Sequence, residues 1–145
     1  PPGAPTDGAG LGQPLPSGAA QEEYDAAYGL LGQGKFAGGE AAFRTFLKRY
    51  PDHQLTSNAR YWIGETLYAR QSYQEAAKAF LEAWQADQRG TKAPDNLLKL
   101  AMSLERLDKK QEACATYAKL LSDYRGAPER LRSAASRERQ SLGCS

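Results

Sequence analysis

The sequence matches itself when it is shifted by 37 residues, and this repeat is the strongest constraint on what the chain can fold into. The shift takes Phe43 to Phe80 and then to Tyr117, so large residues align with large ones. Small residues align in the same way at Gly39, Ala76 and Ala113. Stacked copies of one packing unit need this agreement, because equivalent positions fill the core or leave room for it in every copy. The repeat therefore predicts three stacked copies of one unit.

Each unit consists of two amphipathic stretches separated by a short polar break. From Tyr24 onward the chain is rich in Ala, Leu, Glu, Lys, Gln and Arg, which all favour helices. Apolar residues recur at i, i+3, i+4 and i+7, the spacing that places them on one side of a helix. Each unit is therefore predicted to be a helical hairpin. The hairpins are expected at about residues 21–54, 57–91 and 94–126, with a last helix near 128–141.

The columns of the repeat resemble the tetratricopeptide pattern of a large residue, Leu–Gly, Tyr, Ala, Phe, Ala and a closing Pro. The middle copy matches this pattern at Ile63, Gly64, Leu67, Ala76, Phe80 and Ala83. The resemblance implies an all-α fold, a right-handed superhelix of three helical hairpins. The last helix would cover the final hairpin as a capping helix, because the end of such an array needs a polar surface.

The first twenty residues have a different composition from the rest of the chain. Half of them are Pro or Gly, and none is aromatic. Such a stretch buries too little apolar surface to offset its ordering entropy. We therefore predict a disordered linker over 1–20 and assign 21–145 to the repeat domain.

Composition and residue types argue against several classes of function. The chain of 145 residues carries 19 basic and 17 acidic side chains, a net charge of +2, which gives no strong attraction to nucleic acid. Its apolar runs are too short for membrane insertion. The single histidine, His53, lies in a polar turn with too few partners for a metal or catalytic site. We therefore predict no enzymatic activity, metal or cofactor.

A partner protein is expected to bind the concave face, which the first helix of each hairpin lines in stacks of this kind. The candidate residues share that face and are Tyr24, Tyr28, Asn58, Tyr61, Glu65, Tyr68, Leu98, Met102 and Glu105. Tyrosines suit recognition because each ring gives a large contact area at low entropy cost. The glutamates favour an apolar helix or extended segment that carries some basic residues. In the alternative, Tyr24 and Tyr61 only pack between neighbouring hairpins. Trp62 is assigned to a hairpin core, and Trp84 to the core between repeats.

A longer run points to a narrower family. The segment "FLKRYPDHQLTSNARYWIGETLYARQSYQEAAKAF" resembles the periplasmic Tol-Pal coordinator family (YbgF, also called CpoB) through its "YP" ending and its "NARYWIGE" block. The third unit continues the resemblance through "KAPDNLLK" and "EAC". Together these segments extend over about residues 22–125, which is most of the predicted helical part.

The resemblance implies a protein-binding scaffold of the Tol-Pal envelope system. Such a protein contacts TolA, with a peptidoglycan synthase as a further candidate partner, and coordinates outer-membrane constriction with septal peptidoglycan synthesis in cell division. The implied location is the periplasm, after removal of a signal peptide. An N-terminal coiled coil, absent from this chain, would make the full-length protein trimeric, and this fragment is expected to be monomeric. The alternatives are a generic tetratricopeptide peptide-binding adaptor and a self-associating structural module.

Two cysteines, Cys114 and Cys144, form a candidate disulfide. Cys114 lies on the second helix of the third hairpin, and Cys144 follows the capping helix. If that helix folds back antiparallel, its end approaches the neighbouring helix, and an oxidising periplasm would favour a bridge. In the alternative, Cys114 packs as a small apolar residue and Cys144 is free on a frayed tail.

Overall fold

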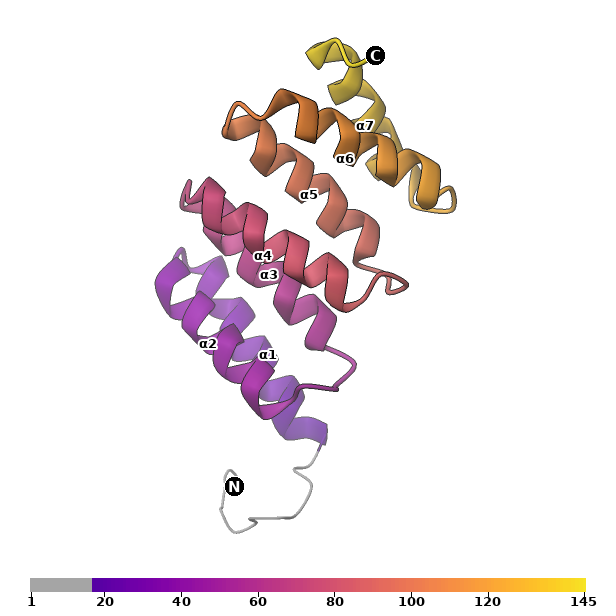
Figure 1. Ribbon diagram of the computed structural model, residues 1–145. Coiled ribbons are helices and arrows are strands. Elements are labelled where there is room, and N and C mark those ends of the chain that lie inside the picture. Colours follow the sequence, from indigo (N-terminus) through magenta and orange to yellow (C-terminus); the bar gives the residue numbers. More distant parts are fainter. Residues whose placement is uncertain (1–16) are drawn as a thin grey trace.

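The computed structural model describes residues 17–145, which form seven α-helices and no strand. The helices are α1 (Ser17–Gly32), α2 (Phe36–Arg49), α3 (Thr56–Ala69), α4 (Tyr73–Ala86), α5 (Ala93–Arg106), α6 (Lys110–Asp123) and α7 (Glu129–Leu142). Consecutive helices pack against each other along the whole array, as Figure 1 shows. The predicted all-α repeat fold of three hairpins and a final helix is therefore confirmed.

The predicted boundary between linker and repeat domain falls too late. Residues 1–16 of the predicted linker 1–20 lie outside the described residues. The last four residues of that stretch belong to α1, which begins at Ser17. Ala20 is buried in the hydrophobic core. The physical reason is local. The Pro and Gly content of the stretch as a whole predicts a linker, but the stretch ends in helix-favouring alanines, of which Ala20 packs into the core.

The aligned large and small columns of the repeat form the core. Phe43, Phe80 and Tyr117 are each fully buried, one per hairpin. The small column at Gly39, Ala76 and Ala113 is buried as well. A Cβ atom added at Gly64 would lie only 2.5 Å from the ring of Phe80, so the two helices of the middle hairpin approach closely at this point. Small residues at fixed distances from large ones therefore set how near paired helices come.

The hairpin turns repeat the same backbone geometry every 37 residues. Each turn passes through the left-handed region at one residue: Gly34 (φ 76°), Gln71 (φ 63°) and Asp108 (φ 59°). In each case the amide of the following residue donates to the carbonyl five positions back, over 2.8–2.9 Å. Glycine adopts this backbone conformation without strain, whereas glutamine and aspartate do so at a cost. The repeat is therefore present in the backbone as well as in the side chains.

The first helices of the hairpins form one layer of the array. The helix α3 contacts α5 directly, and α5 contacts α7 in the same way. Figure 1 shows α2 and α4 in front of α1 and α3, so the second helices form the opposite layer. We call the surface formed by α1, α3 and α5 the inner face.

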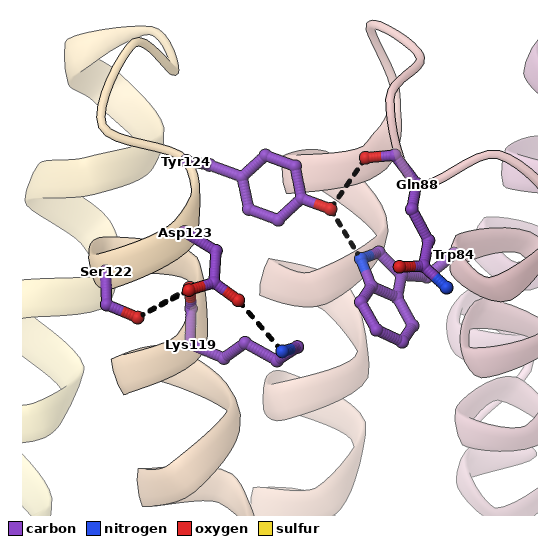
Figure 2. A network of polar contacts seen from close by, with 6 residues as sticks. All are labelled: Trp84, Gln88, Lys119, Ser122, Asp123 and Tyr124. Carbon is purple, nitrogen blue, oxygen red and sulfur yellow. Dashed lines mark hydrogen bonds and ion pairs between the residues drawn. The ribbon is translucent and has the colours of Figure 1, made fainter.

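On the layer formed by the second helices, a polar network links the third hairpin to the second. The indole N–H of Trp84 donates to the Tyr124 hydroxyl over 2.8 Å, and that hydroxyl donates to the Gln88 carbonyl over 2.7 Å (Figure 2). Lys119 forms an ion pair with Asp123 at 2.8 Å, and its Nζ lies 5.4 Å from the centroid of the Trp84 ring. Trp84 therefore packs between repeats, as the sequence predicts.

The helix α7 covers the end of the third hairpin and is attached there by a disulfide. Its residues Leu131 and Ala135 are buried against α5 and α6. The disulfide joins Cys114 of α6 to Cys144, with a Cα–Cα distance of 5.7 Å. The guanidinium of Arg139 also donates to the Cys114 carbonyl over 2.9 Å. The hypothesis of a bridge between the two cysteines is therefore confirmed.

Candidate protein-binding face

The tryptophan on α3 lies at the seam between the first and second hairpins. The indole N–H of Trp62 donates to the Tyr24 hydroxyl of α1 over 2.9 Å. Its ring makes an edge contact with Tyr28 at a centroid distance of 5.0 Å. The prediction that Trp62 fills a hairpin core is therefore wrong. On α3, Ile63 and Leu67 are buried instead, and the adjacent Trp62 faces α1.

Four aromatic side chains gather at this seam, and we call Tyr24, Tyr28, Tyr61 and Trp62 the aromatic cluster. Trp62 contacts Tyr61 at a centroid distance of 5.2 Å as well as both tyrosines of α1. Tyr28 is the exposed member, with 49% of its surface accessible. Rings fixed by edge contacts lose little entropy when a partner covers them, because their rotamers are already set. The cluster therefore offers a preorganised aromatic surface.

Two of the candidate binding residues contribute little surface. Tyr61 is only 8% exposed and Leu98 only 9%, because both pack in the core. Burial raises the pKa of Tyr61 far above its ordinary value, and the neighbouring Glu65 carboxylate adds to the shift. These two residues lie beneath the inner face, and the ring of Tyr61 packs against Phe80 of its own hairpin, at 5.9 Å between centroids.

Tyr24 is half-buried and serves both hairpin packing and the seam. Its ring makes edge contacts with Phe43 and Phe46 of α2, at 5.5 and 6.0 Å between centroids. Burial raises the pKa of its hydroxyl, whereas hydrogen bonds from Trp62 and Asn58 lower it. Asn58 therefore lies beside the aromatic cluster, as the repeat spacing predicts.

The two candidate glutamates are already occupied by partners within the chain. The Glu65 carboxylate accepts a hydrogen bond from the Tyr61 hydroxyl over 3.0 Å and pairs with Lys99 at 2.9 Å. The Glu105 carboxylate accepts a hydrogen bond from the Tyr117 hydroxyl. Burial raises the pKa of Glu105, and the nearby Glu138 raises it further. Neither glutamate is therefore a strong attractant for a basic partner.

Two cations of α5 and the lysine that directly precedes it lie over aromatic rings of the middle hairpin, and the sequence reasoning missed them. We call Lys92, Lys99 and Arg106 the cation row. Their charged groups lie 4.4 Å, 4.7 Å and 5.0 Å from the ring centroids of Tyr61, Tyr68 and Tyr73, in that order. Cation–π contacts of this kind hold a charge in place without neutralising it. The seven-residue spacing was the available signal, because it places all three on one side of α5.

The remaining candidates flank this row. Tyr68 is half-buried and packs edge-on against Tyr73 at 5.1 Å between centroids. Met102 is half-buried on α5 and packs against the core. Together with Tyr28 and the cation row, these residues give the inner face aromatic rings and charges of both signs, because Glu65 pairs with Lys99 and Glu105 adjoins Arg106 in the sequence. Tyr24, Tyr28 and Asn58 therefore lie at the α1–α3 seam, and Tyr68 lies further along α3, beside Tyr73 of α4.

A groove lies on the opposite layer, between α2 and α4. This groove of about 270 Å³ has Ile63 and Leu67 in its floor, and its walls carry charges of both signs, including Arg44 and Glu82.

Among the described residues, no group of three acidic, histidine or cysteine side chains is placed to hold a metal ion. No helix in the described part has the length and apolar character needed to cross a bilayer.

The repeat family follows from comparison with known protein families. A tetratricopeptide repeat model matches residues 24–96, which is half of the chain, and a second tetratricopeptide model matches residues 95–127. The chain therefore belongs to the tetratricopeptide repeat family, whose members use stacked hairpins to hold other proteins.

Curated relatives narrow this class. The cell division coordinator CpoB of Pseudomonas putida is 40% identical over 62 residues, which is 43% of this chain and 23% of the relative. The cell division coordinator CpoB of Escherichia coli K12 is 42% identical over 62 residues, which is 41% of this chain and 23% of the relative. These matches confirm the family resemblance seen in the sequence, and each extends over about a quarter of the relative's length.

Proposed function

We propose that this domain is a protein-binding scaffold of the periplasmic machinery that coordinates envelope constriction with septal wall synthesis during cell division. The tetratricopeptide family supports the protein-binding part, and the relatives named as cell division coordinators support the cellular role. The disulfide between Cys114 and Cys144 supports an oxidising compartment, where such bonds persist. The proposed partner is a TolA-like envelope protein.

The aromatic cluster is the observation that carries the binding proposal. Tyr28 exposes 49% of its surface on the inner face and rests on Trp62. A half-exposed tyrosine on a fixed tryptophan is typical of the residues that dominate binding energy at protein interfaces. The affinity of such a small contact is expected in the micromolar range.

A titration with the purified periplasmic part of the TolA-like protein from the source organism tests the proposal. Calorimetry should show binding to the wild-type domain and about tenfold weaker binding to Tyr28→Ala, because truncating an interface tyrosine removes roughly 1–2 kcal/mol. Leu81→Ala is the matched control, since Leu81 of α4 is the other large apolar residue that is exposed in the described part, at 39%. An absence of binding to the wild type, or equal losses in the two variants, would reject the proposal.

A further inference from the structure

The groove between α2 and α4 has an equivalent place one repeat further along the array. The helices that surround it recur at the repeat interval, because α2, α4 and α6 begin at Phe36, Tyr73 and Lys110. Every residue that lines the groove therefore has an equivalent between α4 and α6. Comparing the two places shows what the groove lacks.

Between α4 and α6 the equivalent space holds the indole of Trp84, at the position that corresponds to Leu47 of the groove. The indole N–H of Trp84 donates to the Tyr124 hydroxyl over 2.8 Å. The Nζ atom of Lys119 lies 5.4 Å from the centroid of the same ring (Figure 2). A fixed aromatic ring, a hydrogen-bond acceptor and a cation thus meet at this second place.

Two residues that line the α2–α4 groove are smaller than their equivalents. Leu47 stands where the next repeat has Trp84, and Ala83 stands where it has the fully buried Leu120. The floor is apolar in both repeats, and in the groove it includes the buried Ile63. The groove of about 270 Å³ therefore corresponds to space that the chain's own side chains fill one repeat later.

The walls of the groove carry the charges that complement an indole. Arg60 and Lys78 line it and form no ion pair within the described residues, and the same holds for Glu82. A cation is attracted to the negative face of an aromatic ring, as the contact of Lys119 with Trp84 shows. A carboxylate accepts the indole N–H, which needs a partner when it is buried. A leucine side chain uses neither of these contacts.

We propose that the α2–α4 groove binds one tryptophan side chain of a partner protein, in the position that Trp84 occupies one repeat later. The groove is smaller than the cavities of about 300–1,000 Å³ that enclose small-molecule ligands, so it suits a single anchoring side chain. Tryptophan is among the residues that most often dominate binding energy at protein interfaces. The site lies on the layer opposite the inner face and is separate from the contact proposed above.

Two neutral peptides that differ at one position test the proposal. Gly-Ser-Trp-Ser-Gly and Gly-Ser-Leu-Ser-Gly, blocked at both ends, are titrated into the domain while NMR follows the methyl signals of Ile63 and Leu67. The tryptophan peptide should shift these signals with a dissociation constant of roughly 1 mM. The leucine peptide should bind at least about fivefold more weakly, because it offers no ring face and no N–H.

Three outcomes of these titrations would overturn the proposal. They are methyl signals that stay unchanged, equal binding of the two peptides, and tighter binding of free indole than of the tryptophan peptide. The last outcome would indicate a small-molecule site.

A variant that copies the next repeat into the groove locates the binding. Leu47→Trp should fill the groove with an indole of the chain itself, and the tryptophan peptide should then bind at least about tenfold more weakly. Leu81→Trp is the matched control, because Leu81 is exposed on α4 and does not line the groove. It should stay within about twofold of the wild type. Equal effects of the two variants would overturn the proposal.

A second variant tests the site without rebuilding its apolar floor. Arg60→Ala removes a cation from the wall, and the tryptophan peptide should bind about threefold more weakly, because a partly exposed cation–π contact contributes that much. Arg89→Ala removes the same charge at an exposed position outside the groove and should have no effect. Circular dichroism verifies that all variants are folded. A preference for tryptophan over leucine that survives Arg60→Ala unchanged would overturn the proposal.

Discussion

At the scale of single residues, small side chains set the distance between the helices of a hairpin. Gly64 of α3 faces the fully buried ring of Phe80 on α4. A methyl group at Gly64 would lie 2.5 Å from that ring, and ring atoms held on all sides cannot move away cheaply. The glycine is therefore required by packing.

We expect Gly64→Ala to lower the free energy of unfolding by about 1–3 kcal/mol, which is the usual cost of an overpacked core. Gly29→Ala is the matched control, because Gly29 is also a helical glycine but an added Cβ would meet nothing within 4 Å. That change should raise stability by about 0.5–1 kcal/mol through the better helix propensity of alanine. Urea unfolding measures both, and equal effects of the two changes would contradict the packing argument.

The sequence predicts such core positions well and the seam positions poorly. The column of Phe43, Phe80 and Tyr117 keeps its size in every copy because every hairpin has the same interior. The prediction for Trp62 is wrong because neighbouring residues on a helix point about 100° apart, and the first helix of each hairpin meets apolar neighbours on two sides. Periodicity alone does not tell which of Trp62 and Tyr61 faces the adjacent hairpin. Only the packed structure does.

At the scale of elements, the contact between α5 and α7 depends on a carboxyl group with a shifted pKa. Burial and then Glu138 of α7 raise the pKa of Glu105 on α5, although the Tyr117 hydrogen bond opposes the shift. The folded protein therefore keeps a proton on Glu105 at pH values where the unfolded chain has released it, above the ordinary glutamate pKa of about 4.3. Stability at this contact is thus present in acid and is lost as pH rises through the folded-state pKa.

The variant Glu105→Gln should lose this decline, because its amide carbonyl still accepts the Tyr117 hydrogen bond and nothing titrates there. The stability of the variant relative to wild type should therefore increase between about pH 4 and pH 8. Urea unfolding over a pH series measures it, with Glu22→Gln, at an exposed position of α1, as the control for loss of a carboxylate. A difference that stays constant with pH would contradict the shift.

The disulfide is the main covalent support of α7. It closes a loop with a sequence separation of 30 residues. In the chain-entropy model a loop of this size contributes about 3.5 kcal/mol by restricting the unfolded chain. The double variant Cys114→Ser/Cys144→Ser should lose about that amount, and reduction of the wild type should match it. Urea unfolding with and without reductant measures both. A wild-type protein that is insensitive to reductant would contradict the prediction.

At the scale of the whole molecule, folding places cations over aromatic rings that lie far from them in the sequence. The net charge of +2 gives no sign of a basic surface. The stacked hairpins nevertheless align Lys92, Lys99 and Arg106 over tyrosines of the neighbouring unit. The ion pair of Glu65 with Lys99 joins two hairpins and leaves no local signal in the sequence. The pairing of Glu65 was therefore beyond the reach of sequence reasoning.

Both ends of the described array are polar, and this bears on whether the domain associates with itself. On α7 the exposed side chains include Ser136, Arg137 and Gln140, and on α1 they include Gln21 and Glu22. Repeat arrays whose outer helices present polar faces do not stack end to end, because no apolar surface remains to be buried. We therefore expect sedimentation velocity to give the mass of one chain, with no dependence on protein concentration. A dimer population that grows with concentration would favour the self-associating structural module. In that case Tyr28→Ala, set against Leu81→Ala, would tell whether the inner face forms the contact between copies.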